Sequence, residues 1–261
     1  MDLSLKGRTA VVCGSSQGIG LAIAKELAEL GASCILLARN EESLTNSVQQ
    51  LSSAQGQNHS YFVIDFNDKE KTRQLIQEIA TKQTVHILVN NSGGPKAGPI
   101  VQATEDQFMQ AFQQHLVINH ILTTTVIEGM KKEGYGRIIN IISTSVRIPI
   151  NNLGVSNTIR WAVASWAKTM ANELGQYGIT VNNVLPGYTL TDRLQSLVQH
   201  NAKAQNTSEE AVMDHLKNEI PAKRFGKPEE VAAFAAFLAT SAAAYINGTS
   251  TAVDGGKTGS M

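Results

Sequence analysis

Short apolar runs alternate with longer amphipathic stretches along most of the chain. The short runs have the length of strands, and the longer stretches repeat their apolar residues with the period of a helix. The predicted strands lie at residues 9–13, 33–38, 61–64, 85–89, 136–142, 179–185 and 250–253. The predicted helices lie at residues 19–30, 69–81, 105–132 and 157–174. Nearly continuous apolar strands separated by helices are typical of a doubly wound α/β fold, in which helices cover both faces of a parallel sheet.

The chain is predicted to form one domain spanning residues 1–261, because no repeat, low-complexity tract or linker divides it. Residues 189–227 interrupt the alternation. They are polar and helix-prone, and they contain no strand pattern. Long excursions in a small fold often carry function, so we expect this segment to be a helical lid over a substrate site.

Charge and cysteine content exclude several classes of protein. The chain has 22 Lys and Arg against 22 Asp and Glu, with a pI near 7.0. It therefore has no net field to attract nucleic acid or an anionic membrane, and we expect neither as a partner. No apolar stretch has the length of a signal or membrane-spanning segment. Cys13 and Cys34 lie in predicted strands, where we expect buried, reduced thiols and hence a cytoplasmic protein.

A glycine-rich turn stands between the first predicted strand and the helix that follows it. Its glycines have a Gly-x-x-x-Gly-x-Gly spacing, and its predicted binding residues are Gly14, Ser16, Gln17, Gly18, Ile19 and Gly20. Glycines let the backbone approach a phosphate closely, and the free N–H groups at a helix N-terminus attract its charge. We therefore expect the turn to hold the pyrophosphate of a dinucleotide. The alternative is a turn that packs closely and binds nothing.

Further motifs follow in order along nearly the whole chain. They include Asn90-Asn91-Ser92-Gly93, the run GRIINI before Ser143, Pro186-Gly187 and the run INGTSTAVDGG near the end. Together with the glycine turn, this series resembles the short-chain dehydrogenase/reductase family, and within it the 3-oxoacyl-(acyl-carrier-protein) reductases. The resemblance implies a single-domain Rossmann fold that binds a nicotinamide dinucleotide and acts on a small-molecule carbonyl or alcohol.

The resemblance also assigns residues to the cofactor cleft. It implies that Asp65 contacts the adenine and that Thr191 approaches the nicotinamide carboxamide. The other cleft residues that it implies are Asn91, Gly93, Pro186 and Gly187. Taken alone, Asp65 is equally suited to cap the end of a strand, and the others are common turn formers.

The end of the second predicted strand bears on the choice between NADP and NAD. An acidic residue there binds a ribose 2′-hydroxyl group, and a basic residue pairs with a 2′-phosphate. This chain has Ala38 followed by Arg39, which favours NADPH over NADH. A solvated arginine without a ligand is the alternative, and the glycine turn supplies Gln17 rather than a second basic residue.

The family's catalytic pattern is broken in this chain. By resemblance, Ser143 matches the catalytic serine, but Ser156 stands where tyrosine is expected and Arg160 where lysine is expected. The tyrosine donates a proton to the developing alkoxide, and the lysine lowers the pKa of that tyrosine. A serine hydroxyl is a far weaker acid, and a guanidinium group stays protonated. Ser156 and Arg160 are four residues apart on one helical face, so the geometry is kept while the acid is lost.

Two other residues are candidates for the missing proton donor. An ungapped count places His115 at the family's asparagine position, with Asn119 one helical turn further on. Histidine titrates near neutral pH, which suits a donor, but a histidine of the core or of an interface is the alternative. Tyr188, beside the predicted cofactor loop, is either a donor or a wall of the cleft.

These features support three functions. The first is an NADP-dependent oxidoreductase in which Ser143 and Arg160 polarise a carbonyl oxygen and the proton donor is unconventional. The second is a nucleotide-binding sensor or partner subunit without hydride transfer. The third uses the same cleft for other chemistry, such as isomerisation.

Self-association is expected as well. Family members commonly pair the two long helices that here span residues 105–132 and 157–174. The second of these carries more apolar surface than a solvent-facing helix tolerates, in Trp161, Val163, Trp166 and Met170. We therefore predict a homo-oligomer, with a tetramer as the expected form.

Overall fold

A seven-stranded parallel sheet forms the centre of the structure, a computed structural model that describes residues 1–259. The strands are β1 (Thr9–Cys13), β2 (Ser33–Ala38), β3 (Ser60–Val63), β4 (Ile87–Asn90), β5 (Gly136–Ile141), β6 (Ile179–Pro186) and β7 (Ser250–Val253). Their order is β3-β2-β1-β4-β5-β6-β7, and every neighbouring pair is parallel. Each predicted strand is confirmed to within two residues at either end.

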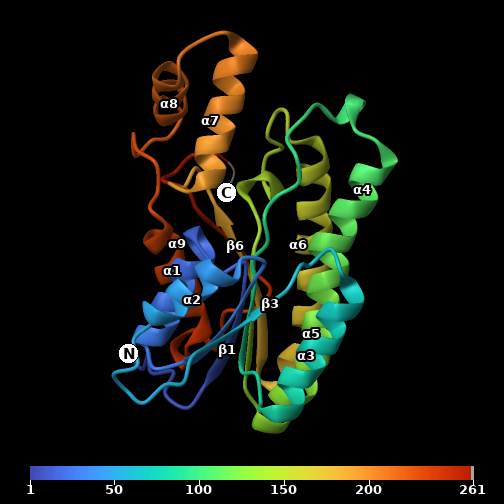
Figure 1. The fold of residues 1–261 in the computed structure, drawn as a ribbon, viewed down its shortest axis with the longest axis vertical. Coiled ribbons are helices and arrows are strands. Elements are labelled where there is room, and N and C mark those ends of the chain that lie inside the picture. Colours follow the sequence, from blue (N-terminus) through green and yellow to red (C-terminus); the bar gives the residue numbers. More distant parts are fainter. Residues whose placement is uncertain (260–261) are drawn as a thin grey trace.

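Helices cover both faces of the sheet, which confirms the doubly wound fold (Figure 1). One face packs against α1 (Gly18–Glu29), α2 (Glu41–Gln49) and α9 (Pro228–Ala239). The other packs against α3 (Lys69–Lys82), α5 (Ile118–Glu133) and α6 (Gly154–Leu174). Side chains alternate between the two faces along each strand, so Val12 enters the first apolar layer and Val11 enters the second.

Two helical predictions are corrected. Helix α2 was not predicted, because its polar sequence buries one apolar residue, Leu44, and its start depends on a cap in which Asn40 accepts a hydrogen bond from the Ser43 N–H at 2.7 Å. The single helix predicted at 105–132 is also wrong. The chain forms α4 (Glu105–Phe112), a π-helical turn at Gln113–Val117 and then α5. No glycine or proline occurs between residues 105 and 128 to mark the break.

The segment 189–227 is helical, as predicted. It contains α7 (Asp192–Gln205) and α8 (Glu209–Asn218), which pack on each other through their own apolar cluster. Its two ends meet where the Leu190 N–H donates to the Gly226 carbonyl at 2.9 Å and Gly226 returns a bond to Tyr188. Because α7 follows β6, the segment lies beyond the carboxyl ends of the strands (Figure 1). Its role as a lid stays a prediction.

The predicted self-association surface on α6 is only partly exposed. Val163 and Met170 are buried, Trp166 is partly covered, and Trp161 is half exposed. The homotetramer stays a prediction. Cys13 and Cys34 are buried free thiols, as expected, and burial raises the pKa of each to about 12. Within residues 1–259, every helix is too short or too polar to span a bilayer.

A row of amides crosses the buried interior of four strands. Asn90 donates to the Asn140 side-chain oxygen at 2.8 Å, Asn140 donates to Asn183 at 2.9 Å, and Asn183 donates to the Ser250 hydroxyl at 3.0 Å. The four residues are in register on β4, β5, β6 and β7. Buried amides need such partners, because an unpaired one loses its bonds to water without replacement. The row therefore fixes the relative height of these strands.

Replacing the central amide tests this row. Asn140→Ala leaves the Asn90 donor and the Asn183 acceptor without their partner, so we expect the free energy of unfolding to fall by about 2 to 4 kcal/mol. Urea denaturation measures the change. Asn46 is exposed on α2, and Asn46→Ala is the matched control, with an expected effect within about 0.5 kcal/mol. Equal losses in the free energy of unfolding of the two variants would show that the row does not stabilise the fold.

Candidate active site

The glycine turn is held by one side chain from the neighbouring strand. The Asn91 carboxamide donates to the carbonyl oxygens of Cys13 at 3.2 Å and Gly14 at 3.1 Å. Gly14 and Gly18 have φ values of +59° and +56°, a region that favours glycine. A Cβ on Gly20 would lie 2.7 Å from the Asn91 amide nitrogen and closer still to the Gly14 carbonyl oxygen. The turn is thus too compact for side chains at these positions.

The N-terminus of α1 is open. Its cap residue, Gln17, makes no side-chain cap bond, and the first turn holds no acidic residue. The backbone N–H groups there carry partial positive charge, which suits an anion such as a pyrophosphate. Thr191 faces the turn from across the cleft, with its methyl carbon 3.3 Å from the position of a Cβ on Gly18. The structure therefore brings the predicted Thr191 to the predicted phosphate turn.

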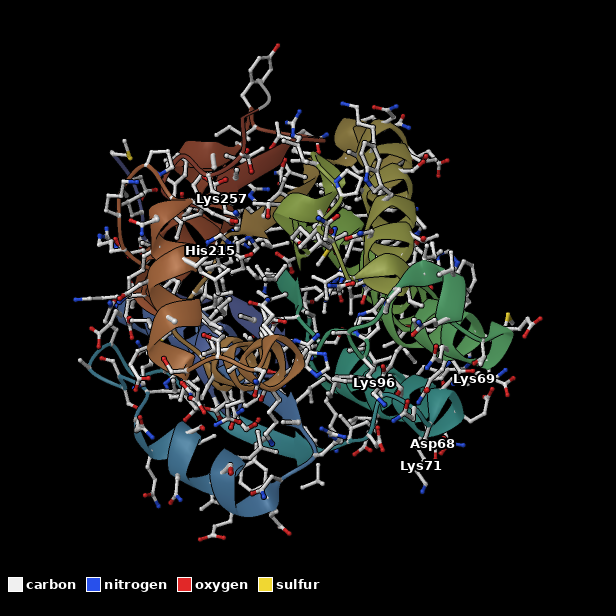
Figure 2. The ribbon with its side chains drawn as sticks, turned by 90° about the horizontal axis from the view of Figure 1, so that it is seen from above. Asp68, Lys69, Lys71, Lys96, His215 and Lys257 are labelled. Carbon is white, nitrogen blue, oxygen red and sulfur yellow. The ribbon has the colours of Figure 1, made fainter. Side chains whose placement is uncertain are left out.

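A groove of about 900 Å³ lies at the ends of β2 and β3. It is lined by Arg39 and Asp65, whose assignment to the adenosine half of a cofactor stays a prediction, and also by Lys69 and Lys71 at the start of α3. Figure 2 shows the two lysines beside Asp68. Lys71 pairs with Asp68 at 3.3 Å, whereas none of the ion pairs within residues 1–259 includes Arg39 or Lys69.

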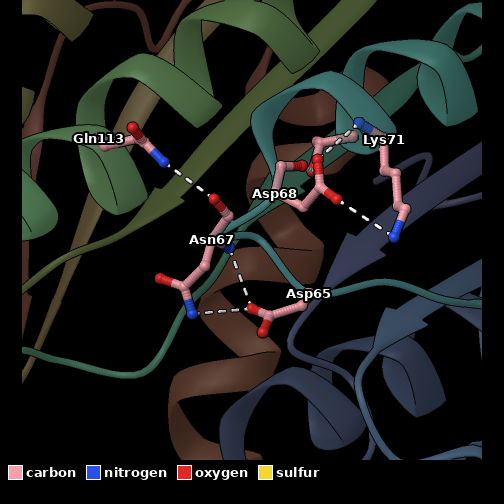
Figure 3. A network of polar contacts seen from close by, with 6 residues as sticks. Asp65, Asn67, Asp68, Lys71 and Gln113 are labelled. Carbon is pink, nitrogen blue, oxygen red and sulfur yellow. Dashed lines mark hydrogen bonds and ion pairs between the residues drawn. The ribbon is translucent and has the colours of Figure 1, made fainter.

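The floor of this groove is tied to the π-helical turn (Figure 3). Asp65 accepts from the backbone N–H of Asn67 at 3.0 Å and from its side-chain amide at 2.9 Å. Gln113, the first residue of the π-helical turn, donates to the Asn67 carbonyl at 2.9 Å. Asp65 does cap a local turn, and its carboxylate stays exposed in the groove.

His115 lies inside the π-helical turn and is almost fully buried, at 1% exposure. Its Nδ1 is 2.8 Å from the Ser92 hydroxyl, and its Nε2 has no hydrogen-bond partner within residues 1–259. Burial and the nearby charge of Arg160 lower the pKa of the imidazole to about 3. His115 is therefore neutral at neutral pH, which argues against an imidazolium acid.

Arg160 is a buried cation on α6, one turn after the buried Ser156. Its Nη1 donates to the Ile141 carbonyl at 3.2 Å, and its Nε has no partner within the described chain. Burial and the charge of Arg193 lower its pKa to about 10, so the guanidinium group keeps its proton at neutral pH. A buried cation with unused N–H groups can donate hydrogen bonds to an acceptor on a ligand.

Ser143 and Tyr188 complete the predicted set. Ser143 follows β5, and its hydroxyl oxygen accepts from the Ser145 N–H at 3.1 Å, which leaves its own proton available. Tyr188 packs edge-on against Phe225 at the base of 189–227, with ring centroids 6.4 Å apart. Burial raises the pKa of Tyr188, so this phenol fits a cleft wall better than a proton donor.

Comparison with known proteins places this site in a family. Residues 14–258 match the family model described as enoyl-(acyl carrier protein) reductase. The chain is 34% identical over 257 residues to a 3-oxoacyl-(acyl-carrier-protein) reductase of Vibrio cholerae, covering 97% of this chain and 98% of the relative. It belongs to the short-chain dehydrogenase/reductase family.

Other relatives act on sugars and sugar acids. Gluconate 5-dehydrogenase of Gluconobacter oxydans is 31% identical over 259 residues, covering 99% of this chain and 97% of the relative. The crystal structure of L-sorbose reductase from Gluconobacter frateurii, complexed with NADPH and L-sorbose, superposes with a TM-score of 0.92 at 29% identity, and each chain is covered completely. Short-chain dehydrogenase/reductase members with one fold thus serve different substrates.

The structure gathers most of the predicted residues of this short-chain dehydrogenase/reductase at the carboxyl edge of the sheet. Gly187 meets this edge through its N–H, which donates to the Val253 carbonyl at 3.0 Å. Asn119 is buried on α5. Three basic residues beside the site were not predicted: Lys69, Lys71 and Arg193. Their only signal in the sequence was a basic side chain close to a motif residue.

The buried, neutral state of His115 predicts that the free energy of unfolding falls at acidic pH. Its pKa rises from about 3 in the folded chain to an ordinary 6.5 on unfolding, so protons favour the unfolded state as the pH falls below 6.5. At pH 5 this amounts to a loss of about 2 kcal/mol relative to pH 7, and the loss continues down to the folded pKa. We expect His115→Asn to remove this part of the pH dependence.

Urea denaturation between pH 7 and pH 5 measures this pH dependence of the free energy of unfolding. His200→Asn, at an exposed position on α7, is the control and should keep the wild-type dependence. Parallel curves for the wild type and His115→Asn would show that His115 takes up a proton equally well in both states.

Proposed function

We propose that this protein binds NADP(H) and transfers hydride between the cofactor and the carbonyl or alcohol group of a small molecule. The observation that carries the proposal is the glycine turn locked by Asn91 against an open helix N-terminus. Relatives described as NADPH complexes or NADPH-dependent reductases support it. The substrates of the relatives differ, so the proposal stops at the class of group that is reduced or oxidised.

The residues present fit a dinucleotide. The turn from Gly14 to Gly20 is a cradle that a Cβ would fill, and a pyrophosphate is the group that such a cradle accepts. Arg39 and Asp65 would hold the adenosine half in the groove at the ends of β2 and β3. Thr191, across from Gly18, would hold the nicotinamide half together with Asn91, Gly93 and Arg160.

The charge of the groove supports NADP over NAD. Arg39 has no ion-pair partner within residues 1–259, and Lys69 lines the same groove. Ala38 supplies no carboxylate for a ribose 2′-hydroxyl group. A 2′-phosphate would pair with the positive charge of Arg39, whereas a 2′-hydroxyl group would leave that charge unpaired.

The proposed mechanism uses serine hydroxyls and fixed positive charge. When bound, NADPH supplies the hydride. Ser143, with its proton free, would donate a hydrogen bond to the substrate oxygen, and Arg160 would stabilise the negative charge that develops on that oxygen. The buried hydroxyl of Ser156, one turn before Arg160, would pass on a proton from water. Neutral His115 keeps Ser92 and the β4 loop in place.

Cofactor choice can be measured directly. Removing a charge-assisted contact to a phosphate costs on the order of 1.5 to 3 kcal/mol, so Arg39→Ala should weaken NADPH binding by about 10- to 100-fold and leave NADH binding unchanged. Fluorescence titration of both cofactors is the measurement. Arg73→Ala, on the exposed side of α3, is the control for a lost surface charge. Equal affinity of the wild type for the two cofactors would refute the NADP assignment.

Turnover separates the enzyme from a nucleotide sensor or partner subunit. Ser143→Ala should slow NADPH oxidation with a carbonyl panel by about 100-fold or more and leave NADPH affinity nearly unchanged, because it removes a hydrogen bond to the developing oxyanion. Arg160→Ala should impair both. Ser165→Ala, at an exposed position on α6, is the control and should keep full turnover.

The double variant Ser156→Tyr with Arg160→Lys restores the family's residue types on the same helical face and should gain ketoreductase activity. For every variant, NADPH oxidation is measured as the loss of its absorbance after anaerobic mixing. If neither the wild type nor this double variant oxidises NADPH while both bind it, the sensor or partner-subunit function replaces the oxidoreductase.

A further inference from the structure

Two arginines from different elements meet beside the loop that follows β4. A Cβ built on Gly94 would lie 3.7 Å from the Nη2 of Arg160 and 3.5 Å from the Nη2 of Arg193. Arg160 comes from α6, and Arg193 comes from the first turn of α7 in the predicted lid segment. These helices stand on opposite sides of the carboxyl end of the sheet in Figure 1, and their guanidinium groups lie beside the same residue, Gly94.

Neither guanidinium group has a counter-ion among residues 1–259. Arg193 donates to the Pro95 carbonyl at 2.8 Å, and Arg160 donates to the Ile141 carbonyl at 3.2 Å. Among the ion pairs formed within residues 1–259, none includes either arginine. Arg160 is 7% exposed and its Nε–H is buried without an acceptor. Most buried cations are paired, so the position of Arg160 is unfavourable until an anion joins it, whereas Arg193 is exposed.

The geometry suits one kind of ligand group. Guanidinium forks bind carboxylate and phosphate oxygens through parallel N–H bonds, and two forks that flank one point can hold such a group from both sides. We propose that Arg160 and Arg193 clamp an anionic oxygen group of the substrate beside Gly94, so that the substrate is an acid. This inference rests on the proposed function, because it names the class of substrate for that site.

The same chemistry has a second source, the pyrophosphate of the cofactor. The substrate is favoured because Gly94 lies beside Arg160, whereas the glycine turn faces Thr191. The two arginines also come from different elements, α6 and α7, and already flank one point in the structure.

Binding of small anions tests the clamp without requiring turnover. Calorimetry at constant ionic strength compares acetate, levulinate and inorganic phosphate with the neutral methyl ester of levulinate. We expect the wild type to bind at least one of the anions more tightly than the ester. Arg193→Ala should weaken anion binding by about 10-fold or more, and Arg193→Lys should weaken it less because the charge remains. Arg73→Ala, on α3, should bind as the wild type does.

Gly94→Ala provides a second variant that leaves both charges in place. Its methyl group would occupy the point that the two Nη2 atoms flank, at ordinary van der Waals distances and without a positive φ, so the fold tolerates it. We expect weaker anion binding from obstruction alone. Undiminished binding in this variant, or no preference of the wild type for any anion over the ester, overturns the clamp.

NADPH titration of the same variants separates the two sources of negative charge. Arg193→Ala should keep its NADPH affinity. If it loses that affinity by about 10-fold and anion binding is unchanged, the arginines serve the cofactor and the inference is wrong. Anion binding that depends on Arg193 without any NADPH oxidation would instead refute hydride transfer and leave the anion site standing.

Discussion

The hydrogen bonds from the Asn91 side chain to the first turn of the chain hold the rest of the site in place. They join the end of β4 to the end of β1, the two central strands from which the sheet grows in opposite directions. At such a reversal of strand order the loops on either side diverge and leave a crevice. A side chain on Gly14 or Gly20 would push these loops apart. The crevice therefore exists because one amide and two glycines permit a very close approach.

The amide row extends this control into the other half of the sheet. Asn90 is the residue before Asn91, and it begins the series that passes through Asn140 to Asn183. Since the row fixes β4, β5 and β6 at one height, the residues that follow these strands reach the same edge together. Ser92, Ser143 and Gly187 each lie within two residues of a strand end and so inherit this alignment. The buried polar residues of the sheet thus set the positions of the reactive ones above it.

Much of this was readable from the sequence, for identifiable reasons. The central strands are mostly apolar and buried on both faces, so their short apolar runs stood out along the chain, and all seven strands were found. Helix α2 escaped prediction because a cap and one buried leucine hold it, and the π-helical turn escaped because one extra residue per turn barely alters the apolar pattern. The position of Arg193 beside Arg160 could not be predicted for another reason, because it depends on two elements that are far apart in sequence.

In the proposed mechanism, the charges around the cleft would let a site without a phenolic acid act on a carbonyl. Arg160 and Arg193 place two cations beside Gly94, and burial together with the charge of Arg160 keeps His115 neutral. Such surroundings lower the free energy of an alkoxide as it forms, so the oxygen need not be protonated at the same moment. The proton can then arrive through a weak donor such as a serine hydroxyl and water. In this proposal, serine and arginine at the family's tyrosine and lysine positions exchange acid strength for permanent charge, and that charge would favour substrates that are themselves acids.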